Sequence, residues 1–351
     1  MKGPIDLETF LPSNYQEIST VKHIHVAIAG FGGVGRAVAG LLLARRNRYR
    51  SLYDVDVRLA AVCGSRAGLS STDGLELQDF DRLIEGRSGP DFLMAARPDV
   101  LIEAGPSNFR TGSPGHGYIG SALDAGIHAI VISKGALVFD GKGLQDRARK
   151  TGAFLKVSGA TAAALPTIDL LNHNLKGCEF IRIEGILNAT TNFLLSAMMD
   201  DGMSFVDALA KAQQGGFAES DPRNDTEGWD TAAKVLILAN FGLDAGLTMD
   251  NIAVDGIQNV TDAQVKAWKD AKLVPKLIGS IVRNDGIYSA KVGVKALPAS
   301  DVFSQVAGKS KAIRITTDTM GEIVAIGSGA EPMATASAAL KDFEHIVMAR
   351  H

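Results

Sequence analysis

Apolar residues in the first half of the chain form short β-type runs separated by segments of helical length. Aliphatic and β-branched residues dominate these runs, as is usual for buried strands. Strand and helix that alternate in this way are typical of a parallel, doubly wound sheet with helices on both faces. We therefore predict an α/β, Rossmann-type first domain, with strands at residues 23–29, 57–63, 99–103, 127–132 and 153–157.

The pattern changes at residues 158–166, which are rich in small side chains and predict a hinge into a second domain. Further strands are indicated at residues 179–187, 287–296, 311–316 and 322–327. A glycine-rich turn then precedes a last helical segment, which we expect to return to the first domain. We predict a dinucleotide-binding domain of residues 1–157 plus 321–351, and a second, α+β substrate domain of residues 158–320, to which the family resemblance given below adds a role in dimerisation.

The first predicted strand runs directly into a glycine-rich turn that opens a helix. Residues 30–35 read GFGGVG, which matches the GxGxxG pattern. Gly30 permits the tight turn, Gly32 lets the backbone approach a pyrophosphate, and Gly35 lets the helix pack on the strand. The phosphates would lie at the helix N-terminus. Between its strand and its helix the motif favours a dinucleotide cofactor, and a turn that only connects the two is the alternative.

The end of the second strand bears on which dinucleotide is used. Asp54 and Asp56 precede this strand and would lie at the wrong end to hold the ribose 2′-hydroxyl of NAD. At the other end the strand runs into Ser65 and Arg66. A hydroxyl followed by a guanidinium suits the 2′-phosphate of NADP. We predict NADP with NAD possible, and the alternative is that Arg66 is a plain surface residue.

Loops after the third and fourth strands belong to the carboxyl edge of the sheet, where ligands of such folds bind. Asn108 is predicted to contact the nicotinamide ribose, although Asn is also a common turn residue. Lys134 would orient a carbonyl or carboxylate group as a point charge, unless it is an exposed turn lysine. The predicted cofactor contacts are Gly30, Gly32, Gly33, Val34, Gly35, Ser65, Arg66, Ser107, Asn108, Ser133 and Gly329.

Five carboxylates precede a lysine in the stretch ESDPRNDTEGWDTAAK. Asp230 and Lys234 are four residues apart in a helical pattern and therefore share one face. A substrate with an amine and a carboxylate would find partners here, and the negative charge would keep Lys234 protonated as a proton donor. A solvated, ion-paired loop is the alternative, and Pro222 disrupts the ligand pattern of a calcium loop. The carboxylates are Glu219, Asp221, Asp225, Glu227 and Asp230.

Composition excludes several classes of protein. The 351 residues are 46% hydrophobic, with 36 basic and 39 acidic side chains and a net charge of -3, so no basic surface for nucleic acid is expected. The N-terminal segment lacks the apolar run of a signal peptide, and no later span suits a membrane. Cys63 and Cys178 are too few for a disulfide framework. We expect a cytoplasmic protein with a small-molecule substrate and no metal, membrane or nucleic-acid partner.

Several blocks together give the chain a family resemblance. It resembles homoserine dehydrogenases at residues 30–37, 133–138, 185–195, 216–239 and 327–342. The resemblance implies NAD(P)-dependent interconversion of L-aspartate 4-semialdehyde and L-homoserine, on the threonine and methionine branch of amino-acid biosynthesis. It also implies a dimer held through the substrate domain, so we expect a homodimer or homotetramer.

Residue roles follow from the same resemblance. Lys134 and Lys234 look like the family's two active-site lysines, while Glu219, Asp225 and Asp230 resemble the acids that hold the substrate and its amine. Thr190 falls where the family has a substrate-contacting threonine. In the resulting hypothesis Lys234 delivers the proton, supported by Asp230, and Lys134 polarises the carbonyl or positions the substrate. Within the motif NATTN at residues 188–192, Thr191 or Asn192 would cap the following helix. The roles of Asp221 and Glu227 are not separable from capping and solvation.

The chain also departs from the family pattern. Ser133 replaces an asparagine, Ala189 replaces a glycine, and residues 331–333 (EPM) replace a glycine-rich stretch. Ser158 replaces the glutamate that usually opens the hinge motif, and alanines replace its glycines, so we do not expect the monovalent-cation site that the family builds there. The length leaves no room for a fused kinase or a C-terminal regulatory domain, and feedback inhibition through such a domain is not expected.

Two further functions stay open at this point. A related dehydrogenase that acts on another small amino alcohol or hydroxy acid would fit Ser158 and the altered last loop. A nucleotide-binding sensor without turnover is the other alternative, and the presence of both lysines and all the acids argues against it. Phosphorylating aldehyde oxidation is disfavoured, because it needs a reactive cysteine and Cys178 has no histidine beside it in sequence.

Overall fold

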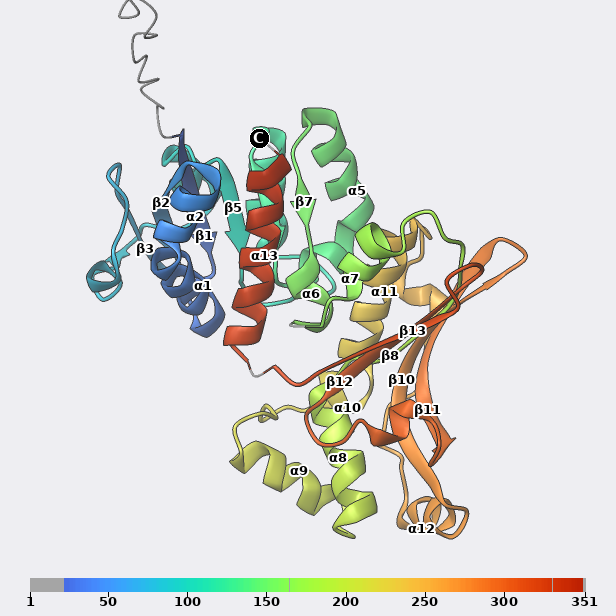
Figure 1. Ribbon diagram of the computed structural model, residues 1–351. Coiled ribbons are helices and arrows are strands. Elements are labelled where there is room, and N and C mark those ends of the chain that lie inside the picture. Colours follow the sequence, from blue (N-terminus) through green and yellow to red (C-terminus); the bar gives the residue numbers. More distant parts are fainter. Residues whose placement is uncertain (1–21, 164, 330, 350–351) are drawn as a thin grey trace, which may run out of the picture.

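A computed structural model describes residues 22–163, 165–329 and 331–349, and its chain forms two sheets with helices packed around them (Figure 1). The first sheet has seven strands in the order β4-β3-β2-β1-β5-β6-β7. Strands β2, β1, β5, β6 and β7 are parallel neighbours, whereas β3 and β4 extend one edge in antiparallel fashion. The strands are β1 (Lys22–Ala29), β2 (Val55–Cys63), β3 (Ala67–Ser70), β4 (Ile84–Glu85), β5 (Val100–Glu103), β6 (His128–Val131) and β7 (Leu155–Lys156).

The predicted doubly wound sheet is therefore confirmed, and its antiparallel edge was not predicted. Strand order reverses between β1 and β5, which is the switch point where ligands of open α/β sheets bind. Helices cover the sheet. They are α1 (Gly33–Ala44), α2 (Arg46–Tyr53), α3 (Pro90–Ala95), α4 (Gly115–Asp124), α5 (Gly135–Thr151) and the C-terminal α13 (Met333–Ala349), with a short 3₁₀ turn at Leu77–Asp79.

The C-terminal helix α13 returns to the first sheet, as expected, and lies beside α1 (Figure 1). Leu340 and Phe343 are fully buried in the same core as Val26 and Leu42. Phe343 also packs edge-on against the ring of Tyr49, with centroids 5.3 Å apart. The two ends of the sequence thus share one hydrophobic core, which fixes the chain's exit from the second sheet.

The second sheet has six strands in the order β13-β12-β8-β10-β11-β9. Its central strand β10 was not predicted, because it is buried along most of its length and so lacks the alternation of a half-exposed strand. Strand β13 also belongs to this sheet, which therefore extends beyond residue 320; the division into domains at that residue stays a prediction. The strands are β8 (Phe180–Ile186), β9 (Ile252–Val254), β10 (Leu273–Asn284), β11 (Ile287–Pro298), β12 (Lys311–Thr317) and β13 (Glu322–Gly327).

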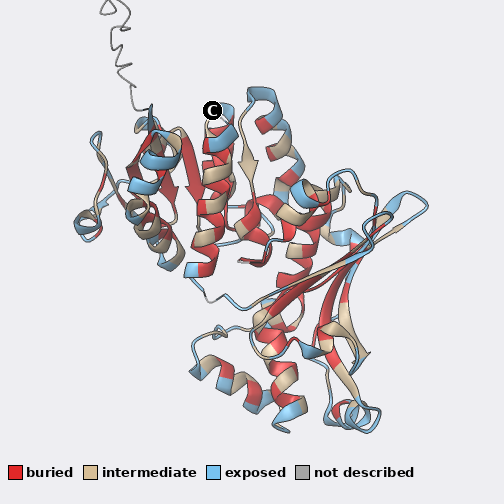
Figure 2. Cartoon of the chain, viewed as in Figure 1, coloured by how far each residue is buried: buried red, intermediate tan, exposed pale blue. Residues whose placement is uncertain are grey.

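Helix α11 packs on the second sheet and is buried from Asp230 to Ala239 except at Lys234 (Figure 2). The helices of this part are α6 (Ser158–Ala162), α7 (Thr167–Asp169), a π-helical turn at Leu170–Asn174, α8 (Ala189–Asp200), α9 (Phe205–Gln214), α10 (Arg223–Thr226), α11 (Trp229–Leu243) and α12 (Asp262–Asp270). Short 3₁₀ turns lie at Met249–Asn251 and Val302–Gln305. No described helix has the length and hydropathy that a membrane span would require.

The N-terminus of α8 corrects one local prediction. Asn188 is the capping residue, and its side-chain oxygen accepts a hydrogen bond from the backbone N–H of Thr191 at 2.9 Å. Asn192 instead lies inside the helix and is buried, and its amide group donates to three carbonyl oxygens of residues 306–310. The cap is earlier than predicted because the helix begins at Ala189, directly after strand β8 and its two-residue exit.

Candidate functional site

Asp230 lies at the centre of a cluster that joins the two sheets. Lys134 occupies the N-cap position of α5, shortly after the end of β6, at the carboxyl edge of the first sheet. Asp230 and Lys234 lie one turn apart on α11, which packs on the second sheet. The Lys234 ammonium is 2.5 Å from one Asp230 oxygen, and the Lys134 ammonium is 3.4 Å from the other. The structure thus brings both predicted lysines to a single carboxylate.

Electrostatics in this cluster keep Asp230 ionised. The residue is 6% exposed, and burial alone would raise the pKa of its carboxyl group. The positive charges of Lys234 and Lys134 outweigh burial, together with hydrogen bonds from Lys234 and Asn188, and hold the pKa of Asp230 well below its usual range. The carboxylate is therefore charged at any physiological pH and anchors both ammonium groups.

Lys234 is held by two acceptors of different origin. Its ammonium donates to Asp230 and to the backbone carbonyl of Leu187, at the end of β8, at 2.8 Å. An ammonium group has three N–H donors. Two are directed into the protein among the described residues, and one is left for a ligand. The side chain is 13% exposed, so it is positioned by the fold and still reachable.

Asn188 links Asp230 to a second carboxylate. Its amide group donates to Asp225 at 2.7 Å and to Asp230 at 2.8 Å. Burial and the negative charge of Asp230 both raise the pKa of Asp225 above its usual value. A cationic ligand near Asp225 would stabilise its charged form. This is the electrostatic setting that suits a substrate amine.

The other predicted substrate contacts lie differently. Thr190 is buried, and its hydroxyl donates to the carbonyl oxygen of Phe217 at 3.2 Å. Glu219 is exposed, and its carboxylate is not part of the hydrogen-bonded cluster around Asp230. Asp221 pairs with exposed Arg223, which lowers the pKa of Asp221 to about 2. These outer carboxylates form a solvated loop next to the cluster.

The glycines of residues 30–35 have the local geometry that the motif requires. Gly30 has a φ of +89°, and a Cβ there would come within 2.4 Å of the Gly105 nitrogen in the loop after β5. A Cβ on Gly35 would lie 2.0 Å from the Gly30 carbonyl oxygen. Gly32 and Gly33 are exposed and face open space, and no side chain caps α1. The turn therefore leaves room for a pyrophosphate against the helix N-terminus.

The second-strand turn keeps its predicted character. Ser65 and Arg66 are exposed at the carboxyl end of β2, in the turn to β3. Asp56 lies inside β2, near its amino end, rather than before it, and its carboxylate binds Arg50 at 2.5 Å and Arg58 at 3.0 Å. The acid that could have held a ribose hydroxyl is thus paired at the far end of the strand.

Several other predicted cofactor contacts have partners within the protein. Ser133 is buried and donates to Glu103 at 2.6 Å, and burial raises the pKa of Glu103. Ser107 accepts a hydrogen bond from the Lys134 backbone at 2.9 Å. Asn108 accepts from the backbone N–H groups of residues 110 and 111, which is a turn role. Together these bonds shape the loops that present Lys134. Gly329 is exposed in the turn before α13.

The hinge does not fit a monovalent cation. Ser158 binds the Asp342 carboxylate through its backbone N–H at 3.0 Å and its hydroxyl at 2.7 Å. The Lys341 ammonium donates to the Ser158 hydroxyl at 2.7 Å and to Asp169, and it pairs with Asp342 at 3.2 Å. The Lys341 ammonium therefore occupies the space among these oxygens, and it would repel a second cation beside it.

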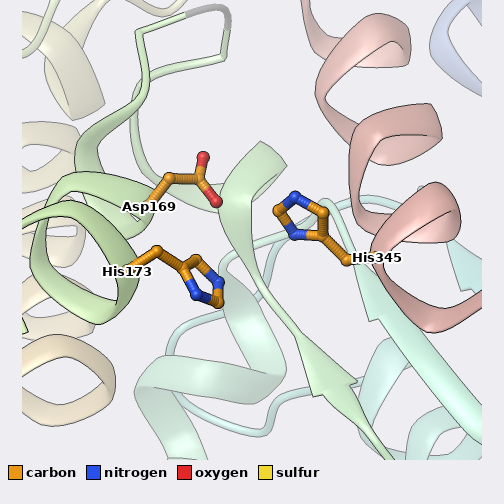
Figure 3. A group of neighbouring side chains, drawn as sticks. All are labelled: Asp169, His173 and His345. Carbon is orange, nitrogen blue, oxygen red and sulfur yellow. The ribbon is translucent and has the colours of Figure 1, made fainter. Parts of the chain in front are cut away.

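One group among the described residues offers three ligand atoms to a metal ion: Asp169, His173 and His345 (Figure 3). The ligand atoms lie within 4.8 Å of one another. Asp169 belongs to α7, His173 to the π-helical turn that follows it, and His345 to α13. Burial and the charge of Lys341 lower the pKa of His345. Because Lys341 also binds Asp169, the positive charge there opposes a divalent cation.

Two residues of the cluster were missed in the sequence. Asn188 belongs to a motif that helix capping already explains. Lys311 belongs to a run of residues whose pattern indicates only a strand. Lys311 begins β12 and is buried near Asp230 and both lysines. Only the polar position at the end of a strand pointed toward Asn188, and no local signal distinguished Lys311 from a surface lysine.

Models of two protein domains match the chain. The homoserine dehydrogenase domain matches residues 166–343, and the NAD-binding domain of homoserine dehydrogenase matches residues 30–157. Among curated relatives, a homoserine dehydrogenase of Methanocaldococcus jannaschii is 33% identical, over 92% of this chain and 98% of its own length. An NAD(+)-dependent homoserine dehydrogenase of Pseudomonas canavaninivorans is 31% identical, over 92% and 95%.

Solved structures agree with this likeness. A crystal structure from Archaeoglobus fulgidus, of a protein assigned as a homoserine dehydrogenase, superposes with a TM-score of 0.84 at 31% identity and covers 92% of this chain and 99% of its own. A homoserine dehydrogenase from Thermoplasma acidophilum superposes with a TM-score of 0.80 at 22% identity, covering 93% and 99%, and shows the shared fold.

Removing the central charge tests how far the cluster depends on it. We expect Asp230→Asn to lower the free energy of unfolding by about 3 kcal/mol, because it leaves two partly buried ammonium groups without their carboxylate. Asp230 has a lowered pKa in the folded state, so its stabilising effect is complete above the reference value of 3.8 and is lost as pH falls through the folded pKa. Urea unfolding at several pH values measures both.

The exposed ion pair of Asp221 and Arg223 provides the matched control. Asp221→Asn should leave the midpoint of urea unfolding nearly unchanged, because the pair is fully exposed to solvent. Equal effects of the two substitutions near pH 7 would contradict a central role for Asp230.

Proposed function

This chain belongs to the homoserine dehydrogenase family, and we propose that the cluster of Lys134, Asp230 and Lys234 is where it performs the family's reaction. The protein is an oxidoreductase that acts on a CH–OH group, interconverting L-aspartate 4-semialdehyde and L-homoserine with a nicotinamide cofactor. The site assignment rests on one observation. The ionised carboxylate of Asp230 is shared by Lys134, which follows a strand of the first sheet, and by Lys234, on the helix that packs on the second sheet. When bound, the nicotinamide supplies the hydride that adds to the aldehyde carbon.

Lys234 is proposed as the proton donor in the direction of aldehyde reduction. As the C=O bond is reduced, negative charge develops on its oxygen, and a proton passes from the Lys234 ammonium to that oxygen to give the hydroxyl group. Asp230 and the Leu187 carbonyl fix the donor nitrogen from two sides. In the reverse direction neutral Lys234 takes the hydroxyl proton.

Lys134 approaches from the cofactor side of the crevice. It lies 23% exposed at the start of α5, next to the loop that contains Ser107. We propose that its ammonium polarises the carbonyl oxygen or positions the substrate between the cofactor and Lys234. Its longer distance from Asp230, 3.4 Å, leaves it free to turn toward a ligand.

The acids are proposed to orient the substrate through its amine. Asp225 is the better placed of them, because the Asn188 amide holds its carboxylate beside Asp230, while burial and the charge of Asp230 raise its pKa. Glu219 and Thr190 remain proposed contacts, with Glu219 on the exposed loop beside the cluster. Their contribution would be orientation more than chemistry.

The preference for NADP is a proposal that rests on the turn after β2. A guanidinium and a hydroxyl are exposed there, while Asp56 is paired at the opposite end of the strand. We propose Ser65 and Arg66 as ligands of the 2′-phosphate. The proposed cofactor contacts along the glycine turn and the later loops are as predicted from the sequence.

A homodimer or homotetramer held through the second sheet is also proposed. Ile181 on β8 and Ile326 on β13 are about half exposed in the single chain, which leaves apolar side chains on this sheet for a partner. The first sheet, with α13, would then serve the cofactor and the second sheet the substrate and the partner.

An oxidation assay tests the function and the cofactor together. We expect NADPH to be oxidised when aspartate semialdehyde is added to the purified protein, with NADH used less efficiently. Potassium or sodium should leave the rate unchanged, because Lys341 occupies the hinge. Tight cofactor binding without turnover, or a faster rate with another amino alcohol than with homoserine, would contradict the proposal.

Substitution of the proton donor has a clear expected effect. Lys234→Ala should lower turnover by at least about a hundredfold, the range typical of general acid catalysis, with cofactor affinity retained. The measurement is kcat at saturating substrate. Lys211→Ala, at an exposed lysine on α9, is the control and should keep normal turnover. Near-normal turnover in Lys234→Ala would remove Lys234 from this role.

Arg66 can be tested by comparing the two cofactors. Arg66→Ser should raise the KM for NADPH by about tenfold, the loss expected for one exposed charge-assisted contact, and leave the KM for NADH unchanged. Arg149→Ser, at an exposed arginine of α5, should change neither value. An equal change for both cofactors would show that Arg66 does not read the 2′-phosphate.

A further inference from the structure

Two lysines are buried in the described part of the chain, and their ammonium groups differ in the partners that they have. Lys276 is 2% exposed and donates to the side-chain oxygen of Asn192 at 3.0 Å and to the Val306 carbonyl at 2.5 Å. Lys311 is 8% exposed, and within the described residues its ammonium makes neither a hydrogen bond nor an ion pair. A buried charge without a partner is costly to the fold, so its presence calls for an explanation.

The charges around Lys311 are those of the candidate site. The charged groups that act on it are Lys234 and Asp230 from α11, Lys134 from the start of α5, and Glu331 from the segment before α13. Burial and the charge of Lys234 lower the pKa of Lys311 to about 8. Lys311 is therefore largely protonated near neutral pH and adds a third positive charge to the cluster.

The backbone around Lys311 is held on both sides. The buried amide of Asn192 binds the carbonyls of Val306, Gly308 and Ser310 at 3.0 to 3.1 Å, directly ahead of Lys311. From Lys311 onward β12 is paired with β13, starting opposite Gly327, and with β8. The backbone that carries Lys311 is thus fixed on both sides by neighbouring segments.

The charge balance identifies the kind of ligand that Lys311 lacks. Asp230 already serves two ammonium groups, Asp225 has a raised pKa, and Glu331 is exposed. Three ammonium groups around one fully ionised buried carboxylate leave an excess of positive charge, which an anionic group would balance. On the proposed function, the substrate has one such group, its α-carboxylate. The cofactor phosphates have their own place at the start of α1.

We propose that Lys311 binds the α-carboxylate of the substrate and so forms an anion-binding subsite of the active site. This inference rests on the proposed function and extends it. The three lysines then divide the substrate between them: Lys234 and Lys134 act at the carbonyl end, and Lys311 holds the carboxylate end. Asp225 takes the amine. Each charged group of the substrate thereby has one opposite charge in the crevice.

Kinetics with homoserine separate binding from chemistry. Lys311→Gln should raise the KM for homoserine by about 10- to 100-fold, the loss expected for one charge-assisted contact in a buried site, with kcat within a few fold of normal. The dissociation constant for NADPH should not change. Lys291→Gln removes an exposed lysine from β11 of the same sheet and should leave all three values unaltered. Lys311→Arg should restore part of the affinity.

A ligand without the carboxylate provides the decisive comparison. 3-Aminopropan-1-ol is homoserine without its α-carboxylate, and its inhibition constant against homoserine oxidation can be measured in each variant. Lys311→Gln should leave this constant unchanged while the KM for homoserine rises. If both constants rise together, or if neither rises, Lys311 does not bind the carboxylate. A change in NADPH affinity in place of homoserine affinity would overturn the proposal in favour of a cofactor contact.

Folding and the function itself are controlled separately. Because Lys311 has no partner to lose, Lys311→Gln should unfold at the same urea concentration as the unmodified protein or at a higher one, and Lys311→Met is a second variant if glutamine is not tolerated. Failure of the unmodified protein to oxidise homoserine would count against the proposed function. A normal rate in that protein, with a Lys311→Gln variant of unchanged KM, would count against this inference alone.

Discussion

The carboxylate of Asp230, held between two ammonium groups, is the interaction on which the rest of the site depends. Buried alone it would tend to be neutral, and the lysines alone would repel each other. Together Lys134, Lys234 and the Asn188 amide keep it ionised, and it in turn fixes both ammonium groups. Because Lys134 follows a strand of the first sheet and Asp230 belongs to a helix on the second, this pairing exists only when the two sheets are correctly joined.

That junction is built from the C-terminal helix and the hinge. Helix α13 shares a core with α1, so it ties the end of the chain to the cofactor sheet. Asp342 and Lys341 on the same helix bind Ser158 at the start of the second part. The Lys341 ammonium thus lies among the hinge oxygens.

Much of the fold was predictable because it has a local cause. Each predicted strand is present, and the glycine turn has the conformations that its motif requires. Strand β10 was missed because burial on both faces removes the alternation by which a strand is recognised. Asn188 was missed as a cap because two later residues of the same motif were equally good candidates by type. Lys311 was missed because a strand that begins with lysine reads as one that begins at the surface.

The sequence by itself determined what depends on near neighbours along the chain. Gly30 and Gly35 set the turn, and the spacing of Asp230 and Lys234 puts their opposite charges on one face of one helix. Only the tertiary structure decided that Lys134 reaches the same carboxylate, that Asp225 and Asp230 share Asn188, and that Lys311 is buried within range of these charges. These contacts join distant segments, and their energies depend on burial. A local sequence pattern does not show which distant segments approach each other or where water is excluded.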